Sequence, residues 1–141
     1  MAITQCVTNQ YKQDVMSGIH QAADVYKIAL FPSTATLNAS TTAYSSTEEL
    51  ASGSGYTQGG VTLSGFTVTL SGSTAVLDWT TDPSWANASF GPVRGALIYN
   101  SSRSNKAVAV FDFGSDKTGG GGTFTAVLPV ADSSTGLIRL A

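Results

Sequence analysis

Few side chains in this sequence could carry acid–base or nucleophilic chemistry, and they are spread along the chain. His20 is the only histidine, so any Ser-His-Asp or Cys-His site would have to include it. The sequence contains no Gly-x-Ser-x-Gly turn that would present a nucleophile to it. Because His20 follows a predicted helix end, an interaction with the helix dipole explains it better than catalysis. We therefore expect a protein that is not an enzyme and has no catalytic residues.

The sequence patterns of the common metal and phosphate sites are also missing. A zinc site needs several clustered cysteines and histidines, whereas this chain has one of each, Cys6 and His20. Asp112 and Asp116 flank a glycine, but two carboxylates lack the pattern of a calcium loop. The glycine run 119–122 is not followed by Gly-Lys-Ser/Thr, so it is not a phosphate loop. We expect no metal and no cofactor.

Composition indicates a small globular protein with an unusual surface. The chain has 141 residues, enough for one domain with a sizeable core, and we treat 1–141 as a single domain. Charged residues make up 11% of the chain, well below the roughly 25% of ordinary globular proteins, while hydrophobic residues make up 42%. Ser, Thr, Gly and Asn supply the remaining polar surface, and these residues suit turns and strand faces.

Charge and hydropathy restrict the possible partners. The net charge is −2 and the seven Lys and Arg are scattered, so the sequence offers no basic patch for nucleic acid. No stretch approaches the roughly 20 apolar residues of a membrane span. The N-terminus lacks the pattern of a secretory signal, and the single Cys6 cannot form an internal disulfide. We expect synthesis in a reducing cytoplasm, with no nucleic-acid or membrane partner.

The first 20 residues form a predicted helical segment. An apolar residue recurs at every fourth position, at Val7, Tyr11, Val15 and Ile19. With Gly18 as a stop, this spacing predicts a short amphipathic helix over roughly 4–17. Such a helix either covers one end of the sheets, which is the commoner arrangement, or acts as an arm that docks on a partner.

Short apolar stretches separated by turn residues predict about eight strands. They cover residues 25–31, 61–63, 66–70, 75–79, 93–99, 107–113, 123–128 and 136–140. The stretches 93–99 and 107–113 are apolar on both faces, so we expect them at the centre of a sheet. The predicted fold class is mainly β, an antiparallel β-sandwich or jelly roll with a short N-terminal helix.

Three further features carry structural predictions. The alternation of apolar residues shifts by one position at Ser64-Gly65, which predicts a β-bulge or a sharp strand bend. Residues 33–54 are rich in Ser and Thr and predict a long surface loop, in which Ser46 and Glu49 fit the capping box of one helical turn. Trp85 lies in an irregular segment, where a core position, an interface anchor and a sugar-stacking surface are all open alternatives.

Several blocks of this sequence, taken in order, resemble a known protein family. They are NQYKQDVMSG (9–18), YKIALF (26–31), GYTQGGVTL (55–63), RGALIYN (94–100), FDFG (111–114) and GLIRL (136–140). Their order and spacing resemble the head cement, or capsid decoration, proteins of tailed bacteriophages, such as that of a Bordetella bacteriophage. The resemblance extends over nearly the whole chain.

The resemblance implies a non-enzymatic jelly-roll protein of the virion, bound to the outer surface of the head across junctions between major capsid protein subunits. It also implies a small symmetric homo-oligomer, with a dimer favoured. The alternative is a tail or fibre module that binds a host-surface glycan, which neutral loops beside Trp85 would suit. In the cement hypothesis, we expect the partner contacts at Tyr11, Val15, Glu48, Glu49 and Trp85.

Overall fold

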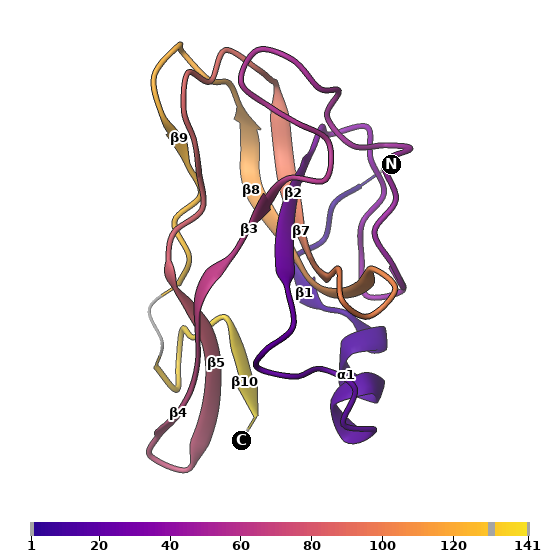
Figure 1. Cartoon of the computed structure of the whole chain (residues 1–141), viewed down its shortest axis with the longest axis vertical. Coiled ribbons are helices and arrows are strands. Elements are labelled where there is room, and N and C mark those ends of the chain that lie inside the picture. The colour runs from indigo at the N-terminus through magenta and orange to yellow at the C-terminus, as the bar shows by residue number, and fades with distance from the viewer. Residues whose placement is uncertain (1, 130–131, 141) are drawn as a thin grey trace.

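Two layers of antiparallel strands face each other, with one short helix at one end of the molecule (Figure 1). The computed structural model describes residues 2–129 and 132–140. Over these residues the elements are β1 (Cys6–Val7), α1 (Asn9–Met16), β2 (Tyr26–Phe31), β3 (Val61–Thr62), β4 (Ser64–Ser71), β5 (Thr74–Thr81), β6 (Ser84–Trp85), β7 (Val93–Asn100), β8 (Lys106–Lys117), β9 (Phe124–Thr125) and β10 (Ile138–Leu140). The predicted class, a mainly β antiparallel sandwich with a short N-terminal helix, is confirmed.

The larger layer is a five-stranded sheet in the order β1-β8-β7-β2-β3. Its strands β7 and β8 are interior, and β7 and residues 107–110 of β8 bury side chains on both faces. Ala96 and Ile98 belong to the cluster between the layers, whereas Leu97 and Tyr99 belong to a second cluster on the outer face. The prediction that 93–99 and 107–113 form central strands is therefore confirmed.

The smaller layer consists of a three-stranded sheet, β10-β5-β4, and the two-stranded pair β6-β9. Trp79 of β5 is 2% exposed and meets the ring of Tyr26, on the opposite layer, edge to face at a centroid distance of 5.3 Å. Phe66 of β4 stacks on the same tyrosine at 5.5 Å. These aromatic contacts hold the layers together, and the predicted core position of Trp79 is confirmed.

The chain passes from one layer to the other between β3 and β4. Leu63 still donates its N–H to the carbonyl of Tyr26 in the larger layer (2.9 Å), whereas Ser64 pairs with Thr81 in the smaller one. Gly65 has φ +81°, and a Cβ there would lie 1.9 Å from Thr80 Oγ1. The bend predicted at Ser64-Gly65 is confirmed, and its cause is a strand that changes sheet.

Helix α1 begins later than the apolar repeat predicts. Residues Cys6–Val7 are extended and pair with β8, and Thr8 caps the helix, its Oγ1 accepting the N–H of Tyr11 at 3.1 Å. The predicted start at residue 4 is wrong because Val7 continues the repeat from a strand. The predicted stop at Gly18 is confirmed by its φ of +69°. The described part of the chain contains no helix long and apolar enough to cross a membrane.

The long segment 33–54 covers the outer face of the larger sheet. Ala35 and Leu37 are buried there against residues of β2 and β7. The helical turn predicted at 46–50 is wrong, because residues 46–49 form a tight turn in which the N–H of Glu49 reaches the carbonyl of Ser46 at 3.3 Å. The Glu49 side chain points inward instead of capping a helix.

Candidate binding groove

The sandwich is open at the end that carries α1 and β10, where the helix rather than a strand faces the three-stranded sheet (Figure 1). Between them lies a groove of about 550 Å³. Eleven described residues line it: Val7, Tyr11, Lys12, Val15, Met16, Val68, Ala75, Leu77, Ile138, Arg139 and Leu140. We call this feature the α1–β10 groove.

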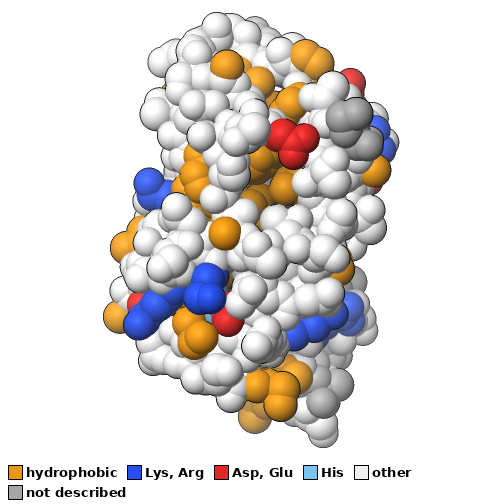
Figure 2. Space-filling model, turned by 90° about the vertical axis from the view of Figure 1, so that its right-hand side faces the viewer, with side chains coloured by type: hydrophobic (Ala, Val, Ile, Leu, Met, Phe, Trp, Pro, Cys, Tyr) orange, Lys and Arg blue, Asp and Glu red, His pale blue; other side chains and the backbone are white. Residues whose placement is uncertain are grey.

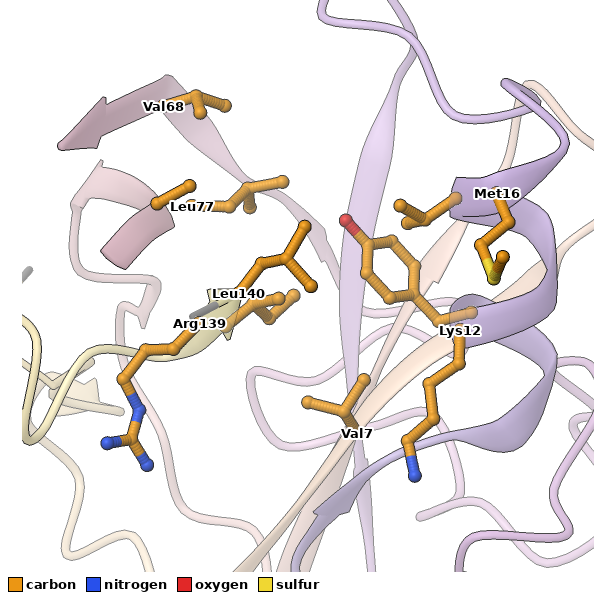
Figure 3. A pocket seen from close by; sticks show the side chains of 11 residues that line it. Val7, Lys12, Met16, Val68, Leu77, Arg139 and Leu140 are labelled. Atoms are coloured by element: carbon orange, nitrogen blue, oxygen red, sulfur yellow. The ribbon is translucent and has the colours of Figure 1, made fainter. Parts of the chain in front are cut away.

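One wall of the groove is the inner face of the three-stranded sheet. Strand register places Val68, Leu77 and Ile138 side by side across all three strands, in a single row. Leu70, Ala75 and Leu140 form the next row, two residues further along each strand. Because alternate residues of a strand share a face, both rows face the same way. Figure 3 shows Val68, Leu77 and Leu140 directed toward the helix.

The other wall is the helix α1. Tyr11 is only 6% exposed and packs on the His20 ring at a centroid distance of 4.8 Å, and its burial raises the pKa of the phenol to about 12. Met16, by contrast, is 92% exposed, and Val15 is 40% exposed. The buried Tyr11 therefore holds the helix wall in place, and Met16 presents a flexible apolar side chain at the edge of the groove.

The two charged residues of the groove lining are both cationic. Lys12 comes from the helix, and in Figure 3 its charged end lies beside Val7, whereas the Arg139 side chain leaves β10 on the side away from the helix. Arg139 Nη1 donates to the carbonyls of Ser133 and Ser134 at 3.2 and 2.7 Å. Among the described residues that line the groove, none is acidic. Figure 2 shows hydrophobic side chains at the lower end of the helix side of the molecule, flanked by Lys and Arg.

A buried polar cluster holds the helix against the larger sheet. His20 Nε2 lies 3.3 Å from Asp14 Oδ2, and both side chains are less than 5% exposed. Asn100, at the end of β7, donates from Nδ2 to His20 Nδ1 at 3.0 Å and to Asp24 Oδ2 at 2.9 Å. Burial lowers the pKa of His20 and outweighs the opposite effect of Asp14. Side-chain packing, rather than the helix dipole, explains this histidine.

Three of the five residues predicted as partner contacts are buried. Tyr11 belongs to the core, and Trp85 is 4% exposed among Tyr56, Phe90 and Phe124. Trp85 is covered because its short strand pairs with β9, so its indole is not available for a partner or for stacking on a sugar. Only Val15 of the groove wall and Glu48, treated next, remain exposed, and their contact role stays a prediction.

The neighbouring carboxylates Glu48 and Glu49 have opposite environments. Glu49 is 7% exposed and accepts hydrogen bonds from the Tyr56 hydroxyl (2.6 Å), the Gly59 N–H (2.8 Å) and the Tyr44 hydroxyl. Its side chain is therefore a buried anchor for the covering segment and cannot form a surface contact. Glu48 is exposed, and Oε1 lies 3.5 Å from the Thr36 nitrogen.

Asp112, one of the two carboxylates considered above as calcium ligands, takes part in an ion pair instead. Asp112 pairs with Arg94 at 2.8 Å, and within the described ranges no group of three or more His, Cys, Asp or Glu could hold a metal ion. The residues that build the groove, above all Met16, Val68 and Leu140, were not predicted as a site.

Comparison with protein-family models, curated proteins and solved structures finds no match to this chain.

Proposed function

We propose that this chain is a non-enzymatic virion structural protein that binds the outer surface of a tailed-phage head across junctions between major capsid protein subunits and stabilises the shell. Two arguments support the proposal. The ordered sequence blocks resemble those of head cement proteins. The α1–β10 groove also leaves an apolar surface without a partner, as a protein with a binding role requires.

The observation that carries the proposal is how the exposed apolar side chains are distributed. Among the described residues, seven large apolar side chains are exposed, and five of these gather at the open end of the sandwich. These five are Val15, Met16, Val68, Leu70 and Leu140. Single exposed apolar residues are normal on a soluble protein, but a group on one surface marks an interaction site.

Stabilisation of a shell by such a protein follows from mass action. A ligand that binds the assembled lattice but not its separated subunits shifts the equilibrium toward the lattice. Many copies, each spanning a junction between subunits, act together on one shell even when each contact is weak. In this proposal the protein is made in the host cytoplasm and lies on the outer surface of the head.

Co-sedimentation tests the proposal. Purified protein is titrated against empty heads assembled from the major capsid protein of the same phage, and the bound protein is counted per particle. We expect saturation at a stoichiometry fixed to the number of capsid subunits. An absence of binding, or only a few copies per particle, would overturn the cement function and favour a tail, vertex or fibre role, including the glycan-binding alternative.

The same proposal includes self-association into a small symmetric oligomer, with a dimer favoured. Sedimentation velocity of the free protein tests this part separately, because a monomer at concentrations that saturate the heads would exclude a preformed dimer.

A further inference from the structure

We infer that the α1–β10 groove is the docking surface of this protein, and that its occupant is an apolar protein segment that carries carboxylates rather than a second copy of the chain. The inference rests on the proposed function only for the identity of the partner, the major capsid protein. The chemistry of the occupant follows from the groove itself.

The lining requires an apolar occupant. Nine of the eleven lining side chains are apolar, and those on the sheet wall form continuous rows across three strands. Rows of this kind normally face an opposing layer, but among the described residues α1 and Val7 of β1 form the other wall, and a gap of about 550 Å³ remains. This space suits a few apolar side chains from one partner segment.

The charge at the rim indicates the charge of the occupant. Lys12 and Arg139 are the charged residues of the described lining, both are cationic, and Lys12 is the one whose charged end lies beside the groove (Figure 3). The whole chain carries a net charge of −2, so the positive rim is a local feature and not a consequence of a basic protein. A carboxylate that flanks an apolar segment would meet the Lys12 ammonium at the edge of an apolar surface, where charge-assisted hydrogen bonds are strengthened.

The same charges argue against a second copy in the groove. Two chains facing each other through this surface would bring their two Lys12 side chains together, with no acidic residue in the described lining to neutralise them. Like charges placed opposite each other across an interface oppose binding and select against that partner.

The groove is also held in shape before any partner binds. The buried Asp14–His20–Asn100 cluster fixes α1 on the larger sheet, and backbone pairing fixes β10 on β5. A preformed site loses little conformational entropy on binding. Met16, unbranched and 92% exposed, can adapt to the side chains that enter.

Two substitutions and two matched controls test the inference in the head-binding assay. Met16→Ser removes an apolar contact, and Lys12→Glu reverses the charge of an exposed rim residue. Val127→Ser and Lys117→Glu make the same chemical changes at exposed residues outside the groove lining. We expect each groove variant to bind heads at least about tenfold more weakly, and each control to stay within about twofold of the unchanged protein. Salt should weaken binding of the unchanged protein more than that of Lys12→Glu.

A second measurement needs no heads. Dodecanoate and dodecyltrimethylammonium, both below their micellar concentrations, are titrated into the protein by calorimetry. We expect tighter binding of dodecanoate, and loss of this preference in Lys12→Glu.

The outcomes separate the groove from the function. If the unchanged protein binds heads and both groove variants bind like their controls, the groove is not the docking surface, although the cement function stands. If heads are not bound but dodecanoate is still preferred, the cement function fails while the groove chemistry stands. The absence of any preference for dodecanoate would overturn the predicted charge of the occupant. Loss of self-association in Met16→Ser, with head binding unchanged, would show that a second copy fills the groove.

Discussion

At the scale of single residues, the buried carboxylate of Glu49 fastens the segment 33–54 to the sheet. It accepts two tyrosine hydroxyls and one backbone N–H, and burial together with this carboxylate raises the pKa of Tyr44 and Tyr56. We predict that Glu49→Gln lowers the free energy of unfolding by about 2 kcal/mol, because an amide offers one acceptor oxygen and no charge. Urea denaturation measures this, with Glu48→Gln as the adjacent exposed control. Equal midpoints for the two variants would contradict the anchoring role.

The buried His20 predicts a pH dependence of the free energy of unfolding. Burial lowers its pKa in the folded protein below the ordinary 6.5, although Asp14 and Asp24 raise it and Lys106 lowers it further. The unfolded chain therefore binds more protons between the folded pKa and 6.5. Above that pH range the neutral His20 should contribute fully to the free energy of unfolding. This contribution should fall as the pH falls through the range.

Comparison with His20→Gln isolates that effect. Denaturation midpoints of the two proteins, measured from pH 8 down to about 5, should converge as the pH falls, because only the unchanged protein loses the contribution of a neutral histidine. Asp24, whose pKa is lowered chiefly by its hydrogen bond with Arg103, loses its contribution only below 3.8 and does not disturb this range. A difference that widens on acidification would mean that His20 gains its proton more readily in the folded state.

At the scale of elements, the start of β3 depends on a close approach between two backbones. Gly60 has φ +76°, and a Cβ there would lie 1.8 Å from the carbonyl oxygen of Ile28 in β2. We predict that Gly60→Ala lowers the free energy of unfolding by more than about 3 kcal/mol, since both the conformation and the strand pairing must change. Gly72→Ala, at φ +61° with open space around it, should cost only about 1 kcal/mol. Similar losses in the two variants would show that β3 tolerates a displaced neighbour.

Most strands could be predicted because period-two alternation and turn residues are local signals. The bend at Ser64-Gly65 could be predicted for the same reason, since a change of sheet must change which side chains face inward. The start of α1 could not be predicted, because Val7 fits the helical repeat but lies in a strand. The inward turn of Glu49 depends on tyrosines that only the folded chain brings near it. These errors arise from tertiary contacts that override local preference.

The groove itself could not be predicted for a related reason. Val68 and Leu140 alternate in the sequence like buried residues, and only the extent of the opposing layer leaves them 59% and 68% exposed. Lys12 and Leu140 come from opposite ends of the chain and line one groove only after β10 pairs with β5. Interfaces of this kind resemble the core in sequence and differ from it only in what covers them.

At the scale of the whole molecule, the open end of the sandwich makes a prediction about the shell. If the groove binds the assembled lattice and not separated subunits, free protein at about 100 times its dissociation constant should stabilise each occupied site by about 2.7 kcal/mol. Calorimetry of empty heads should then show a transition temperature that rises with added protein until the sites are full. Met16→Ser should need a higher concentration for the same rise, whereas Val127→Ser should follow the unchanged protein. Heads that are fully occupied but melt at their original temperature would mean that the protein binds assembled and separated subunits equally, because a ligand with equal affinity for two states does not shift the equilibrium between them. Such a protein would decorate the shell without stabilising it.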